Sequence, residues 1–141
     1  MDQLTAIFKA LSDRNRLRIV SALLKHKELR ACQLTELIQV TGATASRHMG
    51  VLISSGLVDS RKDGRWVYYR ILREQAHFKV LIDWIELQFR SDLSTIFDSK
   101  ALDDIMSYEP EDLCRKQRGD KCCPKDETNQ PLKLRELSYE Q

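Results

Sequence analysis

The 141-residue chain has no long apolar run. No stretch approaches the roughly 18 residues that a bilayer-spanning helix needs, so we expect no role at a membrane. The opening residues, MDQLTAIFKALSDRNR, carry an early acid and lack the basic start, apolar stretch and cleavage site of a signal peptide. These absences predict a cytoplasmic protein. There, four cysteines are more typical of metal ligands or redox sensors than of structural disulfides.

The chain also lacks the usual signs of catalysis. It has no nucleophile–base pair, no phosphate-binding loop and no pair of acids in a cleft-forming context, so we expect no enzymatic activity. It contains no internal repeat and no low-complexity tract. Its length suits one domain followed by a tail.

Charge is distributed asymmetrically between the two halves of the chain. Residues 1–73 contain 13 Lys and Arg against 6 Asp and Glu, a net charge of +7. Residues 74–141 contain 10 against 15, a net charge of −5. Such polarity favours a polyanion as the partner of the first half.

The spacing of apolar residues predicts four helices in the first 55 residues. The second follows a cap at Ser12 or Asp13 and ends at the polar run 25–28. Gly42 supplies a tight turn before the fourth, which Thr41 or Thr44 caps. Two helices joined by a short turn with glycine are the helix-turn-helix arrangement. The other three helices are expected at about residues 3–10, 31–39 and 44–55.

The pattern then changes to alternating aromatic and β-branched residues around Asp63-Gly64, which predicts a β-hairpin with a basic tip. A long helix is expected over 74–97, and at about 36 Å it exceeds what so small a domain can cover, so part of its apolar face should meet another subunit. From Asp98 onward the apolar pattern thins. The predicted class is therefore mainly α with a small β-hairpin (α+β), with a domain at 1–98 and a tail at 99–141.

Polar side chains gather where a helix-turn-helix protein reads DNA. The N-terminal end of a recognition helix meets base edges in the major groove. A basic hairpin tip adds contacts to phosphates, which raise affinity more than sequence choice. We predict that double-stranded DNA is bound by Thr44, Ser46, Arg47, His48, Lys62 and Arg65.

The stretches "FKALSDRNRLRIVSALL" and "TASRHMGVLISSGLVDSRKDGRWVYYRI" resemble the ArsR/SmtB family of metal- and metalloid-responsive repressors, and the likeness runs over about residues 3–97. This resemblance implies a homodimeric winged helix-turn-helix protein, paired through its first and last long helices. It also implies a palindromic operator that is released when an inducer binds. Arg14 stands where the family commonly has proline, which is favoured but not required at a first helical position.

The family's usual inducer sites are incomplete in this chain. Arsenical-resistance repressors often carry E-L-C-x-C-x-x-C on the third helix, whereas here only Cys32 remains, with Arg30 and Thr35 at the outer positions. Zinc- and nickel-sensing relatives carry an Asp/His/His/Glu set on the last long helix. The corresponding helix here offers a single histidine, in the set Glu74, His77, Asp83 and Glu86.

Three thiols remain, in the segment "DLCRKQRGDKCCP": Cys114, Cys122 and Cys123. Trivalent arsenic and antimony are soft ions that three thiolates satisfy, so we expect arsenite or antimonite as the inducer and no required cofactor. Zinc needs a fourth ligand, which Asp112, Asp120 or Cys32 would have to supply. Another thiophilic metal, or a thiol-redox or sulfide response, stays open as an alternative.

Overall fold

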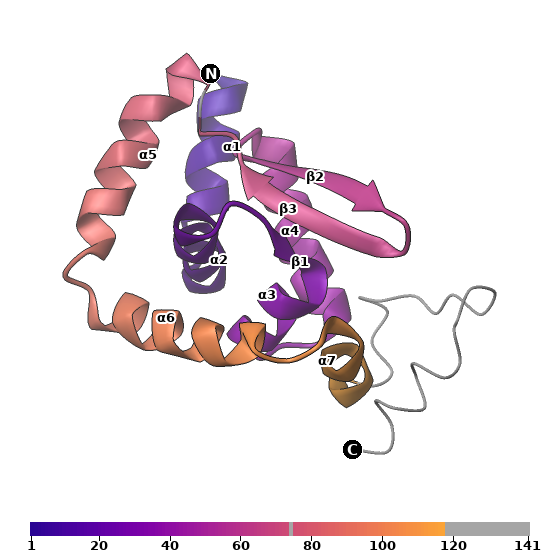
Figure 1. Cartoon of the computed structure of the whole chain (residues 1–141). Coiled ribbons are helices and arrows are strands. Elements are labelled where there is room, and N and C mark those ends of the chain that lie inside the picture. Colours follow the sequence, from indigo (N-terminus) through magenta and orange to yellow (C-terminus); the bar gives the residue numbers. More distant parts are fainter. Residues whose placement is uncertain (74, 118–141) are drawn as a thin grey trace.

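The computed structural model describes residues 1–73 and 75–117, and Figure 1 shows their arrangement. Helices surround a central α2, and a β-hairpin projects from them at one side (Figure 1). Within these residues no helix is both long and apolar enough to cross a bilayer. The elements in chain order are α1 (Asp2–Leu11), α2 (Arg14–Lys25), β1 (Leu29–Arg30), α3 (Ala31–Ile38), α4 (Gly42–Ser55), β2 (Val58–Asp63), β3 (Trp66–Ile71), α5 (Ala76–Phe89), α6 (Leu93–Met106) and α7 (Pro110–Gln117).

The junction of α1 and α2 is fixed by Asp13, as the sequence predicts. Its carboxylate accepts hydrogen bonds from the backbone N–H groups of Asn15 at 2.8 Å and Arg16 at 3.2 Å, and so caps α2. Partial desolvation opposes ionisation, but these two donors and the Arg16 charge hold the pKa of Asp13 below its ordinary value. Ile19, Val20 and Leu23 of α2 are buried in the core.

The helix-turn-helix is formed by α3 and α4, and its turn differs in detail from the expectation. Gly42 is the first residue of α4 and not part of the turn. The left-handed backbone falls on Gln39, which ends α3 with φ 55°. Thr41 caps α4, because its hydroxyl accepts a hydrogen bond from the Thr44 N–H at 3.2 Å. Ile53, an apolar residue near the end of α4, is exposed.

The hairpin is confirmed and belongs to a three-stranded antiparallel sheet of order β1-β3-β2. Asp63 pairs with Trp66, so the two turn residues are Gly64 and Arg65, one position later than Asp63-Gly64. Gly64 has φ 66°, a conformation that glycine adopts without steric cost. The sequence did not reveal β1, which is only two residues long and pairs with β3. This pairing ties the hairpin to the start of α3.

The single helix expected over 74–97 is wrong: two helices, α5 and α6, occupy this region (Figure 1). The chain turns at residues 90–92, where the Asp92 carboxylate accepts a hydrogen bond from the Ser94 N–H at 3.0 Å and caps α6. Apolar residues at 89, 93 and 96 continue the helical spacing across the turn, which hides it in the sequence.

Packing continues beyond residue 98, where the sequence suggested a boundary. Leu102 and Ile105 of α6 and Leu113 of α7 belong to the same buried core as α2 and α3. Arg18 of α2 donates to both carboxylate oxygens of Asp98, at 2.8 and 3.1 Å, and to the Leu37 carbonyl at 2.8 Å. The boundary at 98/99 therefore falls inside α6. The class, mainly α with a small antiparallel sheet in a winged helix-turn-helix, is confirmed.

Candidate nucleic-acid interface

The N-terminal half of α4 presents two side chains to solvent. Ser46 and Arg47 are exposed, whereas Ala45 and Met49 on the opposite side of the helix are buried. Thr44 is half-buried, and its hydroxyl accepts a hydrogen bond from the Thr41 hydroxyl at 3.1 Å. Of the predicted base-reading residues, Ser46 and Arg47 are thus placed to reach a groove without first breaking a contact.

His48 is half-buried and lies against Arg16 of α2. The Arg16 Nη1 is 3.0 Å from the His48 Nδ1, and Arg16 also donates to the Ala10 carbonyl at 2.8 Å. Because a guanidinium only donates, Nδ1 is the acceptor, which places the proton of the neutral ring on Nε2. Arg16 therefore joins α1, α2 and α4, and His48 helps to hold the recognition helix in position.

The two predicted cations of the hairpin, Lys62 and Arg65, have different surroundings. Lys62 is exposed and makes no ion pair within residues 1–73 and 75–117. Arg65 forms an ion pair with Glu111 of α7 and lies over the Trp66 ring, 5.1 Å from its centroid. Its side chain is only 22% exposed. Within the part of the chain that the structure describes, Lys62 is therefore unpaired, whereas Arg65 is already held by an acid.

A layer of arginines and aromatic rings, which sequence reasoning missed, stiffens the hairpin. Arg61 lies 4.4 Å from the Tyr68 ring centroid and makes two hydrogen bonds of 2.8 Å to Glu28. The Arg61 hydrogen bond lowers the pKa of Glu28. Arg30 lies over both Trp66 and Tyr68, at 5.5 and 5.1 Å. The sequence signal that could have predicted this layer is the occurrence of Arg and aromatic residues together on the facing strands of the hairpin.

The predicted inducer thiols lie mainly beyond the described part. Cys122 and Cys123 lie outside the described residues, and Cys114 belongs to α7 with its side chain outside them. The side chain of His77 is also outside them. Cys32 is fully buried in α3. Among the described side chains, no group of three or more His, Cys, Asp or Glu is arranged to hold a metal ion.

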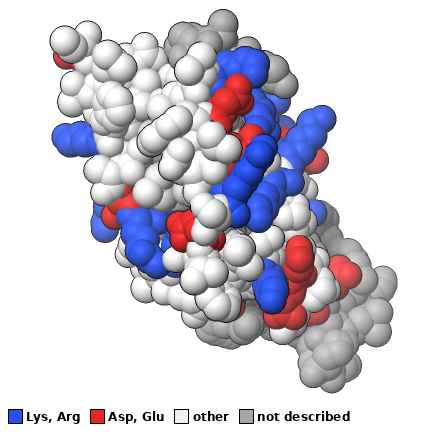
Figure 2. Space-filling view, turned by 90° about the vertical axis from the view of Figure 1, so that its left-hand side faces the viewer, with Lys and Arg blue, Asp and Glu red and all other residues white. Residues whose placement is uncertain are grey.

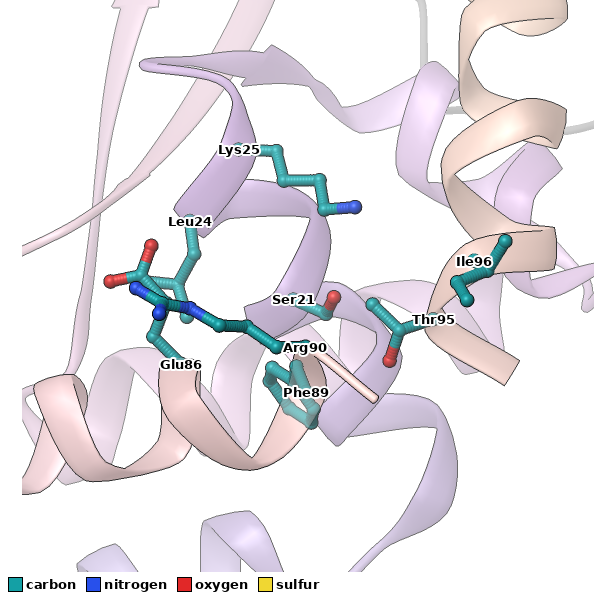
Figure 3. A pocket seen from close by; sticks show the side chains of 8 residues that line it. All are labelled: Ser21, Leu24, Lys25, Glu86, Phe89, Arg90, Thr95 and Ile96. Atoms are coloured by element: carbon teal, nitrogen blue, oxygen red, sulfur yellow. The ribbon is translucent and has the colours of Figure 1, made fainter. Parts of the chain in front are cut away.

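A cavity of about 260 Å³ lies at the corner between α2, α5 and α6 (Figure 3). Its walls combine the apolar side chains of Leu24 and Phe89 with the hydroxyls of Ser21 and Thr95. Lys25 and Arg90 also line it, and both are exposed.

The outer side of α5 is largely uncharged (Figure 2). Val80, Trp84 and Leu87 of this helix are exposed, with Val80 at 80%. Leu4 and Phe8 of α1 are exposed as well, although they lie on the apolar side of that helix. Large apolar side chains on two helices are typical of a surface that another protein covers.

The N-terminal half of the chain resembles known bacterial regulators. Residues 13–60 match the model of the family described as "Bacterial regulatory protein, arsR family". The cadmium resistance transcriptional regulatory protein CadC of Listeria innocua is 48% identical over 67 residues, which are 48% of this chain and 56% of that protein. The arsenical resistance operon repressor of Bacillus subtilis is 34% identical over 70 residues, 50% of this chain and 67% of that one.

The fold also occurs in solved structures. The homodimeric winged helix-turn-helix domain of Mb0332 from Mycobacterium bovis, a possible ArsR-family regulator, has a TM-score of 0.54 and 28% identity. The likeness covers 65% of this chain and 82% of that one. This chain spans little more than half the length of the cadmium resistance regulator that it matches. The matched residues 13–60 include the helix-turn-helix and the first half of β2, so they contain the predicted DNA contacts of α4 but not Lys62 and Arg65 of the hairpin.

Proposed function

The chain belongs to the ArsR family of bacterial regulatory proteins, and on that premise we propose that it is a homodimeric repressor that leaves its operator when thiolates bind an inducer. Members of this family are DNA-binding transcriptional regulators, which agrees with the expectation that the chain is not an enzyme. Because the bacterial operator lies in the cytoplasm, operator binding would place the protein there.

One observation carries the DNA-binding part of the proposal: Ser46 and Arg47 are exposed on α4, which packs against the strand that carries Lys62. Arg47 can make a bidentate contact to guanine or bind a phosphate, and Ser46 can bond to either kind of group. Lys62 supplies a phosphate contact from the hairpin. Thr44, His48 and Arg65 are also proposed contacts, but each already has a partner within the chain.

The proposed dimer is supported by the exposed apolar side chains of α1 and α5. Leu4 and Phe8 on one helix and Val80 and Trp84 on the other expose large apolar area, which a second copy would cover. The Mb0332 domain is itself homodimeric. Two copies would bring two α4 helices to successive major grooves, about one DNA turn apart.

For the inducer, we propose trivalent arsenic or antimony bound by Cys114, Cys122 and Cys123. The number and softness of the three sulfur donors support this choice. Relatives named as arsenical resistance repressors are 34 and 42% identical in their matched segments. Cadmium is the second candidate, because the 48% identical relative is named for cadmium resistance. The thiol-redox or sulfide response remains the alternative of different chemistry.

The DNA-binding part is tested by selecting sites from a random duplex pool and titrating the selected DNA with wild type, Arg47→Ala and Lys100→Ala. Loss of one base contact should weaken binding by about 1–3 kcal/mol for Arg47→Ala and relax the base preference at one position of each half-site. Lys100→Ala removes an equal charge from α6 and should bind as wild type does. Equal affinities for all three proteins would contradict the role of α4.

The inducer is tested by repeating the operator titration with arsenite, antimonite, cadmium or an oxidant. Arsenite should weaken wild-type binding about 5- to 150-fold, the usual range of allosteric coupling. It should leave the Cys122→Ser, Cys123→Ser double variant unaffected, whereas a Cys32→Ser variant should still respond. Release by cadmium alone would select the second candidate, and release by the oxidant alone would select the redox alternative.

A further inference from the structure

The C-terminal helix α7 is docked on the DNA-binding half of the molecule. Leu113 is 1% exposed and is buried in the common core. The Gln117 side chain donates to the Cys32 carbonyl at 3.0 Å and to the Glu36 carboxylate at 3.1 Å, both on α3. Glu111 pairs with Arg65 at the hairpin tip. One short helix, which lies beside α3 in Figure 1, therefore packs on the helix-turn-helix and reaches the hairpin through the Glu111 side chain.

The Glu111 carboxylate binds Arg65 in the way that a DNA phosphate would. Both groups are anions that accept hydrogen bonds from the forked guanidinium, and one guanidinium cannot serve both fully. Arg65 and Glu111 are each partly buried, with 22 and 30% of their side chains exposed. To bind a phosphate, Arg65 must leave a contact that is already desolvated.

We propose that α7 is an autoinhibitory segment, in which the Glu111 carboxylate pairs with Arg65 of the hairpin and so opposes DNA binding. The inference rests on the proposed function, because it assumes that the hairpin meets DNA. The docked and DNA-bound positions of Arg65 exclude each other. The affinity for DNA then depends on how often α7 is docked.

The charge of the C-terminal arm, residues 98–117, has the sign that this competition needs. The arm contains six Asp and Glu against three Lys and Arg. Asp103, Asp104 and Glu109 are exposed. Phosphates that approach the hairpin would therefore repel the arm as well as compete for Arg65.

Release of α7 requires only the contacts of that helix to break. Residues 107–109 join α7 to α6, so α7 can undock while α6 keeps its buried contacts with the core. Undocking would break the Glu111–Arg65 pair and the Gln117 hydrogen bonds to α3, and it would expose Leu113. It requires no unfolding of α4 or the hairpin.

The arm also offers a route from inducer to DNA. Cys114 follows Glu111 by three residues on α7. The helix that would bind the inducer through Cys114 therefore also carries the Glu111 carboxylate that pairs with Arg65. If inducer binding favours the docked helix, it raises the occupancy of the Arg65–Glu111 pair and lowers DNA affinity. By thermodynamic reciprocity, DNA then weakens inducer binding by the same factor.

The test uses the full chain and a random-sequence 30-base-pair duplex, without inducer, over a series of salt concentrations. Glu111→Gln frees Arg65, so it should tighten binding about two- to tenfold and steepen the slope of log K against log[salt] by up to about 0.9 per protomer. Arg65→Gln should weaken binding and make the slope shallower. Glu109→Gln is the control, because it removes the same charge two residues away and Glu109 forms no ion pair within the described part of the chain.

A double-mutant cycle separates occupation of Arg65 from a general effect of charge or folding. Glu111→Gln should change nothing in the Arg65→Gln background, because the arginine that it frees is absent. If Glu111→Gln matches Glu109→Gln, or acts equally with and without Arg65, autoinhibition through this pair is refuted. Urea unfolding of each variant identifies any loss of affinity that is due to misfolding.

Failure of this inference can be distinguished from failure of the proposed function. If wild type binds neither the duplex at low salt nor any selected site, the repressor proposal fails. If wild type binds and Arg65→Gln weakens binding while Glu111→Gln has no effect, only the autoinhibition fails. Arsenite should lose part of its effect in Glu111→Gln, and a full effect there would show that the inducer acts by another route.

Discussion

Replacing Leu102 by alanine tests whether α6 is part of the cooperative core. Leu102 lies beyond the boundary that the sequence suggested, yet it is 1% exposed and packs in the common core. Truncation removes three carbons, worth about 2.4 kcal/mol at about 0.8 kcal/mol for each. The cavity left behind raises the expected cost to about 2.7–5 kcal/mol. That is a large share of the stability of a small domain.

The assay is urea unfolding followed by circular dichroism at one protein concentration, because dimerisation makes stability depend on concentration. Leu93→Ala is the matched control: it is the same substitution on the same helix, at a residue that is 68% exposed. It should change the free energy of unfolding by at most about 0.5 kcal/mol. If Leu102→Ala costs no more than Leu93→Ala, α6 does not contribute to the core as described.

Two further pairs of variants test the capping and glycine positions by the same assay. Asp13→Ala should cost about 1 kcal/mol, and Asp13→Asn much less, because asparagine also caps. The pKa of Asp13 is lowered in the folded state, so its contribution to the free energy of unfolding is complete above the ordinary carboxyl pKa and is lost as pH falls through the folded pKa. The Asp13→Asn variant should lack this pH dependence. Equal pH profiles of stability for wild type and Asp13→Asn would contradict the role of the Asp13 carboxylate as the cap. Gly56→Ala should cost about 1–2 kcal/mol, because φ is +88° and the new Cβ would lie 3.4 Å from the Phe78 ring. Gly50→Ala meets nothing within 4 Å and should stabilise α4 by about 0.5–1 kcal/mol, so similar effects at both glycines would refute this explanation.

The helix-turn-helix and the hairpin are readable from the sequence because local signals specify them. Asp13 and Thr41 are capping residues directly before apolar periodic segments, and Gly64 stands just before the aromatic and β-branched run 66–71. The same local reasoning identifies the exposed end of α4, with Ser46 and Arg47. Each of these features depends on residues within a few positions of one another.

Other features escape the sequence because distant residues decide them. The pair of Arg65 and Glu111 joins positions 46 residues apart, and the bond from Gln117 to the Cys32 carbonyl spans 85. No periodicity reports such contacts. The turn between α5 and α6 did leave a local cue, since Asp92 is a good capping residue. The uninterrupted apolar spacing around it concealed the turn.

The complete burial of Cys32 has a practical use. A thiol reagent can modify this residue only when the core opens around α3, so the rate of its modification reports how often the folded protein opens. Mass spectrometry after brief alkylation could follow Cys32 in the presence of arsenite, cadmium or DNA without any added label. The modification rate of Cys32 thus reports the local stability of α3, the helix on which α7 is docked.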